Sequence, residues 1–70
     1  MKYRVEQSFI GVHIKIDGTS DFIRLQPGTV FSVRSKRRSG MVNVMYDRRI
    51  LAVFERDIQE RAIQIKAVGN

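Results

Sequence analysis

Three short apolar segments joined by two arginine-rich turns occupy the middle of the chain, and a short helical pattern follows them. The apolar segments span residues 29–35, 41–46 and 50–54, and the helical pattern spans residues 55–62. Segments of this length that are rich in β-branched and aromatic residues and bounded by turn residues are typical of β-strands. Strands followed by a single helical turn predict a small, mainly β domain.

A hairpin is expected before this region. Residues 10–16 alternate isoleucine or valine with other residues, and this period of two predicts a strand whose isoleucine–valine face is buried. Asp17-Gly18 favours a type I′ turn, because both central residues of that turn need a positive φ. The return strand is expected over residues 21–26, with Phe22 packed.

The helical pattern precedes a final strand. Two oppositely charged pairs lie four positions apart and can form ion pairs along one helix face: Arg56 with Glu60, and Asp57 with Arg61. Residues 63–66 alternate again and predict a closing strand. Five or six strands are expected in total, and Tyr3 and Val5 belong either to the strand at residues 10–16 or to a separate short one.

Five or six short strands with one helical turn before the last strand resemble an SH3-like β-barrel. The chain also resembles a group of small uncharacterised bacterial proteins in segments within residues 3–12, 27–29 and 41–61, which read YRVE…FIGV, PGT and MVNV…FERDIQER. This resemblance covers nearly the whole chain. It implies one barrel domain over residues 1–70 and a bacterial origin, and it carries no known activity.

Two more distant resemblances point to other functions. Residues 42–46 are loosely similar to the Val-Gln-Ile-Tyr segment of plasmid-borne trimethoprim-resistant dihydrofolate reductases, which build a pore from four SH3-like barrels, but Asn43 replaces the glutamine. Residues 51–61 are similar to the last strand and helix start of the carbon storage regulator family, which are small RNA-binding β dimers. Phe54 stands where that family usually has histidine. No site residue is carried over from either family.

The composition limits the chemistry that the chain can perform. There is no cysteine, so disulfides and thiolate chemistry are excluded, and a reducing cytoplasm is the expected location. His13 is the one histidine, and no group of residues has the spacing of metal ligands or of a catalytic triad. We therefore expect no enzyme activity, no cofactor and no metal ion, and no small-molecule substrate is evident.

No membrane association is expected either. The chain has no apolar run of the roughly 20 residues that cross a bilayer. Glu6 and Gln7 also interrupt the apolar stretch that a signal peptide needs.

Positive charge is concentrated in the two central turns. The chain has 13 Lys and Arg against 7 Asp and Glu, a formal charge of +6, which attracts polyanions. The residues expected to bind nucleic acid are Arg34, Lys36, Arg37, Arg38, Arg48 and Arg49. A stacking platform for bases would come from whichever of three aromatic residues is exposed: Tyr46, Phe31 or Phe54. Because no base-reading motif accompanies them, the prediction is binding without sequence specificity, to RNA or to DNA.

The same two turns flank residues 41–46, so they should lie at opposite ends of a strand about 20 Å long. One compact basic patch is therefore not expected within a monomer, although an elongated groove or an oligomer could join the two turns. Exposed arginines also occur simply because they raise solubility.

Residues 41–46 and 50–54 are apolar on both faces. A small barrel has one interior, so one set of side chains should face outward unless something covers it, and exposed apolar surface marks an interface. The residues assigned to this expected interface are Met41, Met45, Leu51 and Val53. The alternative function is therefore protein–protein interaction or assembly into a homodimer or higher homo-oligomer. The buried face of residues 29–35 stays open, because Val30 lies on one face and Phe31 and Val33 on the other.

Overall fold

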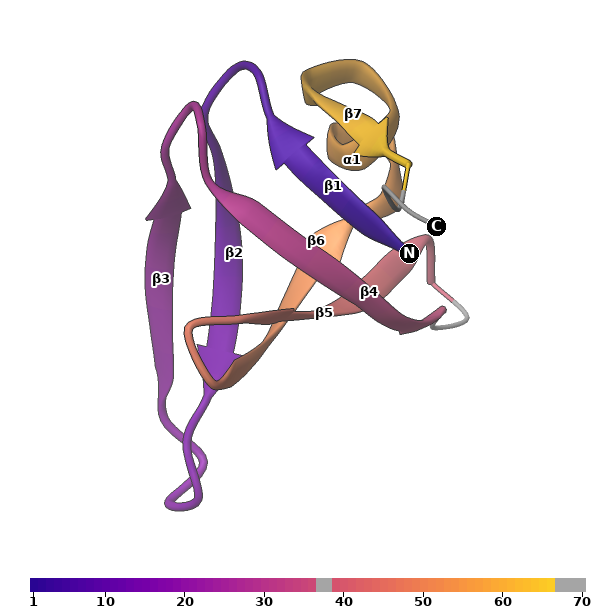
Figure 1. Cartoon of the computed structure of the whole chain (residues 1–70). Helices are drawn as coiled ribbons and strands as arrows, with labels where there is room; N and C mark the ends of the chain where they lie inside the picture. The colour runs from indigo at the N-terminus through magenta and orange to yellow at the C-terminus, as the bar shows by residue number, and fades with distance from the viewer. Residues whose placement is uncertain (37–38, 67–70) are drawn as a thin grey trace.

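A computed structural model gives the structure of the chain and describes residues 1–36 and 39–66, with the side chain of Lys36 excepted. Arg37 and Arg38, two of the expected nucleic-acid contacts, lie outside the described residues. The described elements, in chain order, are β1 (Lys2–Val5), β2 (Phe9–Ile14), β3 (Ser20–Leu25), β4 (Val30–Lys36), β5 (Met41–Tyr46), β6 (Arg49–Phe54), α1 (Glu55–Arg61) and β7 (Ala62–Ile65) (Figure 1). The prediction of a mainly β chain with one short helix before the last strand is confirmed.

The strands of the described part form one antiparallel, seven-stranded sheet in the order β3-β2-β6-β5-β4-β1-β7. Tyr3 and Val5 lie in a strand of their own, β1, and the described strands number seven where five or six were expected. The sheet curls, with β4 and β1 lying across β6 in Figure 1. Its edges are β3 and β7, and no pairing within the described residues joins them.

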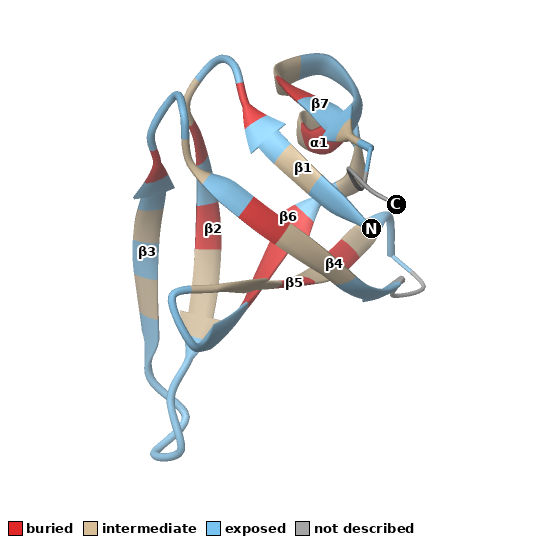
Figure 2. Cartoon of the chain, in the orientation of Figure 1, coloured by how far each residue is buried: buried red, intermediate tan, exposed pale blue. Residues whose placement is uncertain are grey.

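The buried side chains form one apolar cluster, and Figure 2 shows where the buried residues lie along the strands. Phe31 is 1% exposed, and its ring stacks on Tyr3 with centroids 5.7 Å apart and meets Phe9 edge-on at 6.1 Å. Phe31 therefore faces inward and Val30 outward, which decides the face that the sequence left open. The buried members of the cluster are Val5, Phe9, Leu25, Phe31, Val42, Val44, Leu51, Val53, Ile58 and Ala62.

Strand β2 buries the face opposite to the one predicted. Phe9 and Gly11 point inward, whereas Ile10 on the isoleucine–valine face is 39% exposed. A Cβ atom added to Gly11 would lie 3.1 Å from Leu51 Cδ1 and 3.1 Å from Val53 Cγ1, so the backbone of β2 rests directly on these side chains. Alternation shows which residues share a face but not which face is inside, and the prediction of a buried isoleucine–valine face is wrong for that reason.

The same contact corrects part of the expected interface. Leu51 and Val53 are 0% exposed, so their assignment to an exposed surface is wrong. They are the side chains of β6 that press against the glycine of β2. The outward side chains of β6 are Ile50 and Phe54, and those of β5 are the two methionines that the sequence assigned to the interface, Met41 and Met45.

The turn with two positive φ angles lies in a different hairpin from the one that the sequence predicts. The hairpin after β2 forms, but its turn is not type I′: Gly18 is left-handed at φ 88° and its N–H donates to the Lys15 carbonyl at 3.0 Å, as in a three-residue loop. Positive φ at both central positions occurs instead between β5 and β6, where Asp47 has φ 50° and Arg48 has φ 62°. The turn with two positive φ angles therefore includes Arg48, a residue type that rarely adopts this conformation.

Helix α1 forms with both predicted ion pairs, at 3.1 and 3.2 Å: Arg56 with Glu60, and Arg61 with Asp57. Exposed pairs of this kind contribute only tenths of a kcal/mol, so the 5% exposed Ile58 attaches the helix to the core. The Arg61 carbonyl also accepts the N–H groups of Glu6 and Gln7, at 2.7 and 3.0 Å, which ties the end of β1 to the helix.

Adjacent residues of β6 provide a test of the assigned faces. Leu51→Ala should lower the free energy of unfolding by about 2–5 kcal/mol, because a buried leucine leaves a cavity that its neighbours fill only in part. Ile50→Ala, at a side chain 42% exposed, should cost about 1 kcal/mol or less. Urea denaturation at low protein concentration measures both, and equal losses would contradict the orientation of β6.

Candidate functional site

The outward side of β3, β2, β6 and β5 forms one apolar surface, called here the outer face. The strand register places Phe22, Val12, Ala52 and Asn43 in one row across it. The exposed large side chains on this face are Phe22 at 75%, Phe54 at 57%, Ile14 at 56%, Ile50 at 42% and Ile10 at 39%. Its half-buried apolar members are Val12, Met41 and Met45. Most of the isoleucine–valine face of β2 that was predicted to be buried thus lies at the surface.

A shallow hollow runs along the outer face. Val12 and Ala52 are its least exposed apolar members and form the floor, and Ile10, Phe22 and Phe54 stand around them. The floor continues towards Ile14 and Ile50. The polar rim consists of Arg24, Asp57 and Arg61. Because the Arg61 guanidinium is paired with Asp57 at 3.2 Å, Arg24 carries the one rim charge that no described residue neutralises.

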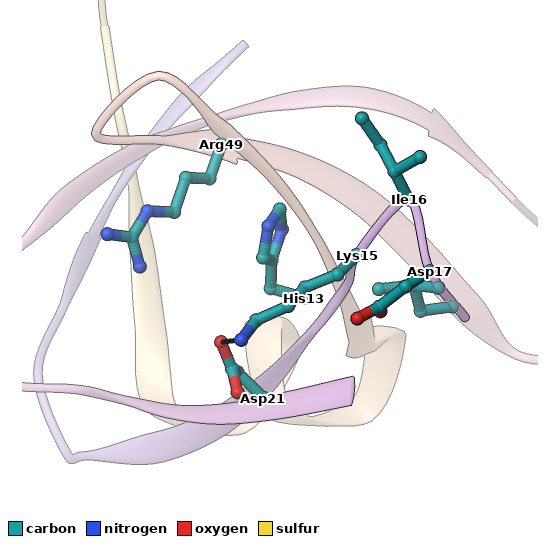
Figure 3. A pocket seen from close by; sticks show the side chains of 7 residues that line it. His13, Lys15, Ile16, Asp17, Asp21 and Arg49 are labelled. Carbon is teal, nitrogen blue, oxygen red and sulfur yellow. Dashed lines mark ion pairs between the residues drawn. The ribbon is translucent and has the colours of Figure 1, made fainter. Parts of the chain in front are cut away.

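A second hollow lies where the β2–β3 hairpin meets β6, and its residues are of mixed charge (Figure 3). Lys15 Nζ lies 3.2 Å from Asp21 Oδ2, and His13 Nδ1 lies 3.3 Å from the Ile50 carbonyl oxygen. Arg49 also lines this hollow, and its side chain makes no ion pair with the residues described. In the described part of the chain, no three His, Asp or Glu side chains come together as metal ligands would.

The tip of the same hairpin holds a negative charge. The Thr19 hydroxyl donates to Asp17 Oδ1 at 2.7 Å, and the Thr19 N–H donates to the same oxygen at 2.9 Å. Both hydrogen bonds lower the pKa of Asp17 below its usual value, and the bond from the hydroxyl has the larger effect. The carboxylate therefore stays ionised to lower pH than a free aspartate, which fits a structural role in closing the loop.

The residues expected to bind nucleic acid are not brought together by the described structure. Arg34 is exposed and lies at the irregularity between Val33 and Ser35 on β4. Arg48 and Arg49 are exposed where β5 turns into β6. The turn before β5 and the turn after it lie at opposite ends of that strand. The side chain of Lys36, with Arg37 and Arg38, falls outside the described residues.

The exposed aromatic residues differ from those expected. Phe31 is 1% exposed and Tyr46 packs against the core, so Phe54 is the one member of the expected set that solvent reaches widely. Phe22, expected to be packed, is instead 75% exposed. The sequence carried a signal for this, because Phe22 shares its face with Arg24, and Leu25 lies on the other.

Comparisons of this chain with protein-family models, with curated proteins and with solved structures found no match. Over residues 1–36 and 39–66, no helix combines the length and apolar character needed to cross a membrane. Function must therefore be inferred from the surface of this chain itself.

Proposed function

We propose that the chain is a small binding and assembly module that packs its outer face against another protein surface. The observation that carries this proposal is the gathering of Phe22, Phe54 and three isoleucines on one exposed side of the sheet. Exposed apolar surface is unfavourable in water by roughly 25 cal/mol per Å². A contiguous patch of it usually marks an interaction site.

The packing of the core does not explain why these exposed side chains are apolar. The core cluster lies on the inner side of the sheet, and an antiparallel sheet with one solvated face normally alternates apolar inward and polar outward residues. Strands β2 and β6 depart from that pattern by being apolar on both faces. Met41 and Met45 add flexible side chains that adapt readily to a partner.

The fold that presents this face is, in the same proposal, related to the SH3-like barrel. The curled antiparallel sheet and the single helix before the last strand support that relation. A cytoplasmic setting is part of the proposal, because a chain without cysteine gains nothing from an oxidising compartment.

A photoreactive residue at position 22 tests the proposed interface. Replacement of Phe22 by p-benzoylphenylalanine keeps an apolar ring on the outer face, and illumination of cells that make the variant should give a discrete adduct that protease destroys and nuclease does not. The control is the same replacement at Ile63, which is 44% exposed on β7, at the opposite edge of the sheet. Equal adducts from both positions, or no protein adduct from position 22, would contradict the proposal.

A second candidate function, nucleic-acid binding without sequence specificity, is supported by the backbone of Arg48. Its φ of 62° lies in the left-handed region, which costs a non-glycine residue roughly 1–2 kcal/mol. A strained residue of this kind fits a use for its side chain. Arg34, Arg48 and Arg49 form no ion pair with any described residue, so their guanidinium groups are available to phosphates.

Arg48→Gly should therefore move stability and binding in opposite directions. Relief of the left-handed strain should raise the free energy of unfolding by up to about 1 kcal/mol. Loss of one phosphate contact should reduce the slope of log K against log salt by about 0.7 for single-stranded nucleic acid. Fluorescence anisotropy between about 50 and 200 mM salt measures that slope.

Arg56→Gln removes the same charge from a helix side chain that is 84% exposed and serves as the matched control. It should leave the slope nearly unchanged. If Arg48→Gly and Arg56→Gln weaken binding alike, the turn has no special role and the attraction reflects net charge alone.

A further inference from the structure

We infer that the outer face is covered by a second copy of this chain, packed face to face about a two-fold axis. This inference rests on the proposed function, since it names the occupant of the same surface. Three properties of the face support a second copy: its area, its shape and the position of the hairpin that carries part of it.

The two exposed rings supply about a quarter to a third of the area that one side of a dimer interface needs. An aromatic side chain has roughly 150–250 Å² of surface, so Phe22 at 75% and Phe54 at 57% exposure together present on the order of 200–300 Å². Three exposed isoleucines, two methionines and the polar rim extend the face well beyond these rings. A specific interface needs about 800 Å² from each side, and the whole chain exposes 5222 Å².

The face carries protruding and recessed parts side by side. Phe22 and Phe54 stand out, whereas Val12 and the small Ala52 form the floor of the hollow between them. An isologous interface brings one patch against itself, so that a ring of one copy can enter the hollow of the other. Aromatic anchors that fill apolar pockets are the usual source of binding energy in such contacts. Apart from the rim, the exposed residues of this surface are uncharged, so a second copy meets little desolvation cost at its centre.

The half of the β2–β3 hairpin beyond the Val12–Ala52 pair is little covered by the other described residues. Strand β3 is an edge strand in which Leu25 is the one buried residue, and β2 registers with β6 at the single pair Val12 and Ala52. Beyond that pair the hairpin extends to Ile16, which is fully exposed. A two-stranded hairpin is only marginally stable in water. A small domain without disulfides commonly gains its remaining support from oligomerisation.

The effect of salt on affinity distinguishes dimerisation from nucleic-acid binding. Two copies that each carry a formal charge of +6 repel one another, and salt screens that repulsion without weakening apolar contact. The dimer should therefore become tighter between about 50 and 200 mM salt, whereas binding to a phosphate backbone becomes weaker over the same range.

Sedimentation equilibrium of the whole chain over a wide concentration range tests the inference. The wild type should reach the mass of a dimer, and the dissociation constant should fall as salt rises. Ile50→Glu places a charge on the outer face of each copy and should raise the dissociation constant by at least about 100-fold. Ile63→Glu is the matched control, since Ile50 is 42% and Ile63 44% exposed, and it should leave the constant within about threefold.

Phe22→Gln provides a second variant in case Ile50→Glu fails to fold, because a side chain 75% exposed contributes little to the folded monomer. It should stay folded by circular dichroism and remain monomeric in the sedimentation experiment. A wild type that stays monomeric at every concentration overturns the second copy, and so does a dimer that Phe22→Gln and Ile50→Glu leave intact.

The two proposals fail in distinguishable ways. A monomeric wild type whose position-22 photoadduct contains a different protein overturns the second copy and supports the broader function. A monomer whose position-22 adduct contains nucleic acid alone overturns both.

Discussion

The contact of β2 with β6 at Gly11 is the constraint on which the rest of the structure depends. Because Gly11 has no side chain, the β2 backbone can rest on Leu51 and Val53, and both become fully buried. A larger residue would need space that a close-packed core does not provide. The contact also fixes the orientation of β2, since Phe9 must then point inward to meet Phe31, 6.1 Å away. The core is thus completed by phenylalanine and glycine, and the isoleucines of β2 lie on the other face.

That orientation creates the surface on which the proposed function depends. Once Leu51 and Val53 are inside, Ile50 and Phe54 must be outside, because neighbouring residues of a strand point to opposite faces. Strand pairing then aligns them with β2, β3 and β5, and apolar side chains from four strands share one side. This arrangement conflicts with a basic, highly charged composition, which otherwise keeps a chain dispersed in water. An apolar face on so charged a chain fits the proposal that a partner covers this surface in the assembled protein.

Local sequence patterns predicted the elements well but not the side of the sheet on which each residue lies. Turn residues and β-branched segments placed the strands, and the four-residue charge spacing placed the helix with both ion pairs. The alternation at residues 10–16 shows that the isoleucines and the valine share a face but not that this face is buried. Burial depended on Gly11, whose effect appears only when β6 is beside it. The side chains expected to face outward were half right for the same reason: Met41 and Met45 face outward, whereas Leu51 and Val53 do not. Residue preference favoured a type I′ turn at Asp17-Gly18. It does not predict the turn with two positive φ angles at Asp47 and Arg48.

The central claim is that the outer face is exposed in a single chain and covered in the assembled protein. Paramagnetic relaxation of isoleucine methyl signals by a soluble gadolinium chelate, recorded at low and at high protein concentration, tests it most directly. At low concentration the methyl groups of Ile14, Ile50 and Ile63 should all relax strongly, because all three side chains are exposed. At high concentration Ile14 and Ile50 should become protected while Ile63 stays accessible. Equal relaxation of all three at every concentration would contradict the claim, and protection of Ile14 and Ile50 while the protein is monomeric would contradict the orientation of β2 and β6.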